Sequence, residues 1–340
     1  MKQPPPLPDE IPGIDIMADQ SREGETPVIS VKELRRSFGA IEAVRGISFN
    51  IYAGQVVGFI GANGAGKTTT MRMMSTLEMP TSGQIIVGGH DVTEDPEKVR
   101  QHIGWMPDSY GAYKDMTVEE YLDFFARAFY FRRDDRRQRV KEVMEFADLF
   151  PIADRLVNKL SKGMGQRLCL GRTLLHDPSV MILDEPAAGL DPKARVEFKR
   201  LINLLSQEGK TIFISSHILS ELSEMCDTLL FIDEGRIVHH GSAENLISPN
   251  QGTVVSVHVA EGVEALAEWV SLNAGVELIE TRRSSVSISI TSKDPKDHAA
   301  ILRKMIMDGI PVTEFRRENQ RLEDAFINLL TKPETPSPAN

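Results

Sequence analysis

Residues 55–69 read QVVGFIGANGAGKTT, and this stretch decides the fold. The continuously apolar run Gln55–Ile60 is typical of a strand buried on both faces. A glycine-rich turn follows it, and a helix is expected to begin near Lys67. Gly61–Thr69 fits the pattern G-x-x-x-x-G-K-[ST], in which backbone N–H groups and a helix N-terminus bind phosphate. The stretch therefore predicts a phosphate-binding loop, the alternative being a glycine-rich turn with a purely structural role.

The side chains of this loop predict a site for ATP and Mg²⁺. Lys67 would reach the β- and γ-phosphates, and the Thr68 hydroxyl would ligate Mg²⁺. The residues of the loop that are expected to bind the nucleotide are Gly61, Asn63, Gly64, Ala65, Gly66, Lys67, Thr68 and Thr69.

A second apolar strand ends in two acidic residues, in VMILDEP at positions 180–186. Asp184 would lie beside the Mg²⁺ shell, and Glu185, one residue on, would act as base on the attacking water. Alone the pattern is weak, because a solvated strand end looks the same. The phosphate-binding loop upstream favours the catalytic interpretation.

Three more motifs lie in the same part of the chain. LSKGMGQR, at 160–167, opens a helix with Ser161, a favoured N-cap residue. GLDP and ISSH follow at 189–192 and 214–217. Together with the phosphate-binding loop and the 180–186 motif, their order and spacing resemble those of an ABC ATPase over roughly residues 28–245.

The resemblance implies contacts that no single motif would predict. Ser161 and Gly163 would bind the γ-phosphate of ATP held by a second cassette, so that a head-to-tail pair, homomeric or heteromeric, is the working unit. Phe38 would stack on adenine, and Asp191 in GLDP would belong to the nucleotide site. His217 would contact the γ-phosphate and position water, the alternative being a histidine satisfied at a strand end.

The motifs depart from the common family pattern at several positions. Lys162 stands where the common form has Gly, and Met164 where it has Gln. Phe38 stands in place of the usual Tyr, and stacking needs only a ring. Asp108, in WMPDSYGAY, replaces a Gln; its carboxylate can still hold Mg²⁺ or the water bound to it, but the charge of the site changes.

The pattern of strands and helices predicts an α/β cassette at 27–248. Its core would be a RecA-like parallel sheet with an antiparallel β flank, and its helical subdomain would span about 106–176. The stretch 250–331 reads β-α-β-β-α-β and then a last helix, Arg321–Leu330, which suits a small ferredoxin-like α+β domain.

Both ends of the chain are rich in proline. Residues 1–26 and 332–340 are expected to be disordered tails, the first with polyproline II character. A ligand for a proline-binding module is the alternative for the first tail.

The amino-acid composition of the chain limits which molecules it can bind and where it can act. Lys+Arg 39 against Asp+Glu 49 gives a net charge of −10, which makes the chain a poor binder of nucleic acid. No stretch approaches the roughly 18 apolar residues that span a bilayer, and the N-terminus lacks the core of a signal peptide. Cys169 and Cys226 are interpreted as small buried residues in a reducing compartment. A cytoplasmic chain is expected.

The resemblance implies an ATPase that drives a separate membrane permease from its cytoplasmic face. RLEDAFINLL, at 321–330, resembles the extension of exporters for drugs, antibiotics or sodium, which favours export. A soluble relative acting on ribosomes or DNA would usually carry two cassettes or an inserted coiled coil. A regulator without turnover would be expected to lack Glu185 or His217.

Two features match none of these motifs. Arg127–Lys141 holds seven basic and two acidic residues, and is interpreted as a solvated helix face, or else as a contact with the membrane subunit or anionic headgroups. The pair His239–His240 is interpreted as surface.

Overall fold

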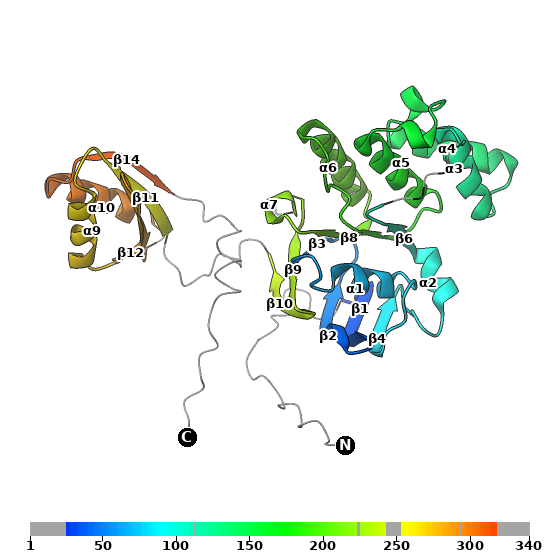
Figure 1. Cartoon of the computed structure of the whole chain (residues 1–340), viewed down its shortest axis with the longest axis horizontal. Helices are drawn as coiled ribbons and strands as arrows, with labels where there is room; N and C mark the ends of the chain where they lie inside the picture. The colour runs from blue at the N-terminus through cyan, green and yellow to red at the C-terminus, as the bar shows by residue number, and fades with distance from the viewer. Residues whose placement is uncertain are drawn as a thin grey trace, which may run out of the picture. The chain divides into compact units, whose positions relative to one another are not determined.

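The computed structural model describes residues 25–109, 111, 113, 115–222, 225–242, 253–292 and 294–317. They fall into two compact units, divided between Ser242 and Ala243 (Figure 1). The predicted helix Arg321–Leu330 and the tail at 332–340 lie outside the described residues, as does nearly all of the tail at 1–26. No helix in these described ranges is long and apolar enough to cross a membrane.

The first unit is built on a six-stranded sheet in the order β10-β9-β3-β8-β7-β6. Its strands are parallel except β10, which pairs antiparallel with β9. The bounds are β3 Val56–Ile60, β6 Ile103–Met106, β7 Val180–Leu183, β8 Thr211–Ser216, β9 Thr228–Asp233 and β10 Arg236–Gly241. Every residue of β3, β7 and β8 is buried, so the strand predicted to be buried on both faces is confirmed.

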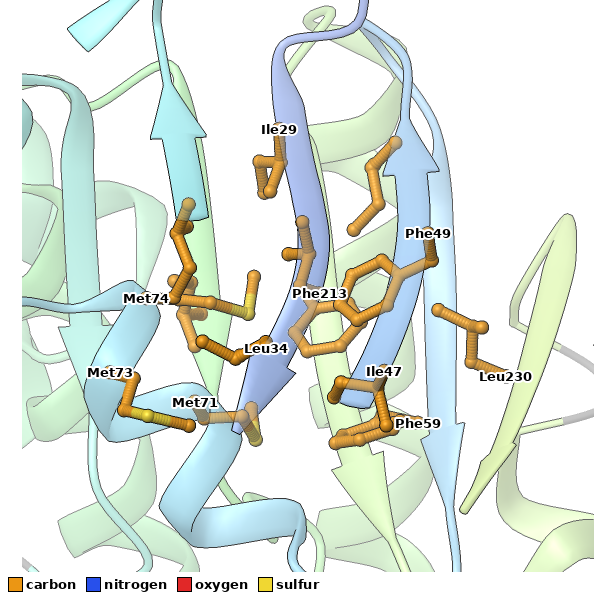
Figure 2. Packing of buried hydrophobic residues seen from close by; sticks show 14 of the residues in the cluster. Ile29, Leu34, Ile47, Phe49, Phe59, Met71, Met73, Met74, Phe213 and Leu230 are labelled. Atoms are coloured by element: carbon orange, nitrogen blue, oxygen red, sulfur yellow. The ribbon is translucent and has the colours of Figure 1, made fainter. Parts of the chain in front are cut away.

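A second, antiparallel sheet has the order β2-β1-β4-β5. Its bounds are β1 Ile29–Phe38, β2 Ile41–Ile51, β4 Ser82–Val87 and β5 His90–Asp91. Phe49 of β2 stacks on Phe213 of β8 with the ring centroids 5.9 Å apart, and Phe59 of β3 lies 5.0 Å from the same ring (Figure 2). This apolar contact joins the two sheets, and buried methionines of helix α1, Lys67–Met74, pack against the same cluster.

Helices fill residues 117–176, within the predicted helical subdomain. They are α3 Val118–Ala128, α4 Arg133–Phe146 and α5 Lys162–Leu174, with 3-10 turns at Phe150–Ile152 and Val157–Lys159. Figure 1 shows these helices gathered together. A capping box between Thr117 and Glu120 starts α3, and the only pairing in the described part of this segment is an isolated bridge from Thr117 to Leu156. Three further helices of the unit are α2 Pro96–His102, α6 Pro192–Gln207 and α7 Leu219–Leu222.

The second unit has the predicted β-α-β-β-α-β order. Its elements are β11 Thr253–Val259, α9 Val263–Leu272, β12 Val276–Thr281, β13 Ser285–Ile290, α10 Pro295–Met307 and β14 Val312–Arg317. The sheet order is β12-β13-β11-β14, with every pair antiparallel. Each helix thus connects two strands that have a third between them, which is the split arrangement of a ferredoxin-like fold.

One surface assignment is wrong. His239 lies on β10 and is half-buried, with its ring edge-on to Phe231 at 5.7 Å. Burial, and secondarily the neighbouring His240, lower the pKa of His239 to about 4. Of the two cysteines predicted to be buried, Cys169 is fully buried, and burial raises the pKa of its thiol to about 11, whereas Cys226 is only partly buried.

Candidate active site

The phosphate-binding loop, Gly61–Thr69, runs from the end of β3 into α1. Gly64 and Gly66 have φ of 85° and 108°, in the left-handed region that favours glycine. A Cβ on Gly66 would stand 2.6 Å from the Ala43 carbonyl oxygen, whereas a Cβ on Gly64 would meet nothing within 4 Å. Residue 66 must therefore be glycine, because any side chain there would collide with the Ala43 carbonyl oxygen. At Gly64 the backbone borders open space, as a loop that approaches a ligand must.

Lys67 is buried inside this loop and is 5% exposed. Its ammonium donates hydrogen bonds to the carbonyl oxygens of Gly61, at 2.7 Å, and of Ala62, at 3.2 Å. It also lies 3.4 Å from a carboxylate oxygen of Glu185. The cation is thus fixed between the loop and the end of β7.

A buried serine ties together the two acidic residues that follow β7. The Ser215 hydroxyl donates to Asp184 Oδ1 at 2.7 Å and accepts the backbone N–H of Glu185 at 2.9 Å. Asp184 is 2% exposed, and burial raises the pKa of its carboxyl group. Hydrogen bonds from Ser215 and Thr68 oppose this rise in pKa, while the like charges of Asp108 and Glu185 add to it.

Glu185 is held where a base would be needed. Its φ of 49° is unusual for a residue with a side chain, and such strain is concentrated at functional sites. Its two carboxylate oxygens reach different partners, since Oε2 lies 2.6 Å from His217 Nδ1 and Oε1 faces Lys67. The carboxylate is therefore oriented by a histidine and a lysine from two other elements.

These residues surround a cavity of about 390 Å³, called here the nucleotide cavity. It is lined by Ala43, Asn63, Gly64, Gly66, Lys67, Thr68, Thr69, Asp108, Lys162, Asp184, Glu185, Ala188 and His217. Gly61 and Ala65 are buried in the loop itself. Phe38, at the end of β1, is 45% exposed and does not line the cavity; the Arg36 guanidinium lies 4.3 Å from its ring centroid.

Ser161 and Gly163, which are expected to bind ATP held by a second cassette, lie outside the nucleotide cavity, and so does Asp191. Ser161, Gly163 and Asp191 line a second cavity, of about 320 Å³. Ser161 caps α5, its Oγ accepting the Met164 N–H at 3.4 Å, and Asp191 caps α6 by accepting the Ala194 N–H at 2.9 Å. This signature cavity, named for the 160–167 motif, contains no residue of the phosphate-binding loop.

The donor set of the nucleotide cavity fits Mg²⁺. Thr68, Asp108 and Asp184 all line it with oxygen atoms, the ligands that this ion prefers. Among the described residues no group of three or more His, Cys, Asp or Glu side chains could hold a metal by itself. Mg²⁺ needs no such cage, because it usually takes one or two carboxylates and completes its shell with water and substrate phosphates.

Sequence reasoning missed two polar residues of the site. Ser215 was seen only as part of ISSH, although a serine at a buried strand position must find a hydrogen-bond partner. Lys162 was seen only as a departure from the common signature. Its position in the nucleotide cavity has no signal in the sequence.

Comparison with known proteins identifies the family. Residues 44–188 match the family model described as ABC transporter. The Nod factor export ATP-binding protein I of Ralstonia nicotianae is 35% identical, over 90% of this chain and 94% of that protein. The protein of the same description from Burkholderia lata is 40% identical, over 88% and 96%. A solved structure described as an ATP-binding subunit of an ABC transporter is 28% identical, with a TM-score of 0.59, over 64% of this chain and 91% of that one.

The chain therefore belongs to the ABC transporter family, among its ATP-binding proteins. It is an ATP-hydrolysing, nucleotide-binding subunit. The predicted resemblance to the ABC ATPases is confirmed, and so is the predicted α/β fold class.

Proposed function

We propose that two of these cassettes pair head to tail and hydrolyse ATP between them to drive export through a separate membrane permease. One observation carries the pairing: a single chain has two half-sites. The nucleotide cavity holds the phosphate-binding loop and the acidic pair, while the signature cavity holds Ser161 and Gly163 at a helix N-terminus. A helix N-terminus attracts anions, so the second half-site would complete the first on a partner.

The residues of the nucleotide cavity would have different roles in ATP hydrolysis. Lys67 would hold the β- and γ-phosphates, and Glu185 would accept a proton from the attacking water. His217, hydrogen-bonded to Glu185, would keep that carboxylate aimed at the water and contact the γ-phosphate. Mg²⁺, when bound by Thr68, Asp184 and Asp108, would supply positive charge that stabilises the phosphates in the transition state.

Export is favoured by the relatives that align over nearly their whole length. Two of them are described as Nod factor export proteins, and their alignments cover the second unit as well as the cassette. The cassettes would act on the cytoplasmic face of the membrane, where the permease would meet them. No nucleic acid is proposed as a partner, because the net charge is −10.

Glu185→Gln tests this function, since it preserves shape and removes the base. Turnover should fall by about 10²–10⁴-fold while ATP still binds. With hydrolysis blocked, light scattering should show a dimer in ATP and a monomer in ADP, and adding Ser161→Arg should abolish the dimer. Because a heteromeric pair would leave the isolated chain monomeric, the measurement is repeated on the complex with its membrane subunit. A monomer in both settings, with ATP bound, would refute the shared site.

A further inference from the structure

Consecutive residues at the start of α5 face two different cavities. Ser161 and Gly163 line the signature cavity, whereas Lys162, between them, lines the nucleotide cavity of its own chain. At a helix N-terminus successive side chains point in different directions, so this separation is physically natural. The consequence is that α5 contributes to both half-sites.

The side chain of Lys162 extends across the loop that follows Glu185. A Cβ on Gly189 would stand 2.7 Å from Lys162 Nζ and 3.5 Å from its Cε. Gly189 has a φ of 67° and no side chain to block this path. Ala188, the residue before it, lines the nucleotide cavity together with Lys162. The ammonium therefore lies beside Gly189, in the loop that follows Glu185.

The charges around the cavity leave Lys162 available to an anion. Three carboxylates line the cavity, those of Asp108, Asp184 and Glu185. Lys67 already contacts Glu185 at 3.4 Å, whereas within the described part of the chain Lys162 has no hydrogen-bond or ion-pair partner. A polyphosphate bound in this cavity would therefore form an ion pair with Lys162, whose ammonium is not already paired with a carboxylate.

Helix α5 gives a second, independent argument. Lys162 is its first residue, and the positive end of the helix dipole makes a cation unfavourable there. A residue that breaks a local rule of stability is expected at a functional site, where another interaction compensates. An anion in the nucleotide cavity would supply that interaction.

We propose that Lys162 binds the terminal phosphate of the nucleoside triphosphate in the nucleotide cavity of its own chain. The inference rests on the proposed ATP site and adds to it a residue that distinguishes a triphosphate from a diphosphate. Because Ser161 and Gly163 flank Lys162, a phosphate held by Lys162 also fixes the helix end that faces the signature cavity.

Nucleotide binding by the monomer tests the proposal, because a monomer contains only contacts within one chain. The Kd of AMP-PNP and of ADP is measured by competition with a fluorescent ADP analogue, on the full-length chain, at a dilution where light scattering shows a monomer. Lys162→Met should raise the Kd of AMP-PNP by about tenfold, the lower end for a hydrogen bond between charged groups. The Kd of ADP should change less than about twofold. Lys162→Arg should keep wild-type values.

Lys159→Met is the matched control, since Lys159 is an exposed lysine three residues away that lines neither cavity. It should leave both dissociation constants unchanged. An unchanged Kd of AMP-PNP in Lys162→Met would overturn the proposal, including the case in which only dimer formation is impaired and Lys162 therefore acts on the partner's nucleotide. A wild-type chain that binds neither nucleotide would refute the ATP site itself, and this inference with it.

Discussion

Ser215 connects the two acidic residues of the site, and its removal should destabilise the cassette. Ser215→Ala deletes one hydrogen bond to the Asp184 carboxylate, at 2.7 Å, and one from the Glu185 N–H, at 2.9 Å. A hydrogen bond to a charged group contributes about 1.5–3 kcal/mol and a neutral one about 1 kcal/mol, so the free energy of unfolding should fall by roughly 2.5–4 kcal/mol. The serine is fully buried, and water cannot replace the lost hydroxyl without a cavity.

Calorimetry on the nucleotide-free, full-length chain measures this effect. The transition of the first unit is the one that AMP-PNP raises, because a ligand stabilises the unit that binds it. Its Tm should fall by roughly 5–16 °C, at about 2–4 °C per kcal/mol for a unit of this size.

Ser75→Ala is the matched control for this measurement. Ser75 is also buried, but its Oγ has no hydrogen-bond partner in the described structure, so its removal should be neutral or stabilising. Equal Tm values for Ser215→Ala and Ser75→Ala would refute the role assigned to Ser215.

Three more outcomes are expected. Asp108→Gln should preserve ATPase activity and Asp108→Ala should reduce it with ATP still bound; equal rates in wild type and Asp108→Ala would show that the carboxylate is no ligand. Burial raises the pKa of Asp184, so the folded chain favours the protonated form of this carboxyl group. Its contribution to the free energy of unfolding is fully present below the pKa of the unfolded chain and is lost as the pH rises through the higher pKa of the folded chain. Asp184→Asn should therefore raise the Tm of the nucleotide-free chain at neutral pH, and the gain should vanish near pH 4 in a pH series. A chain ending at Ser242 should bind ATP in a fluorescence titration; loss of binding in a folded truncation would contradict a separate second unit.

Several features could be predicted from the sequence because they depend on neighbouring residues. The strand, glycine turn and helix of Gln55–Met74 follow from an apolar run and from glycines at positive φ. The start of α5 follows from its N-cap residue Ser161, and the two β-α-β halves of the second unit follow from their alternation. The stacking of Phe38 on adenine stays a prediction; its ring lies beside Arg36 and outside the nucleotide cavity.

By itself, then, the sequence determined the order of the motifs, the fold class and the residue types available for ATP chemistry. Only the tertiary structure decided which side chains meet. Ser215 reaches Asp184 from a strand 31 residues away, His239 is half-buried against Phe231, and Lys162 lies in a different cavity from its two neighbours. The physical reason is that secondary structure depends on local hydrogen bonding and periodicity, whereas contacts between elements depend on the packing of the whole chain.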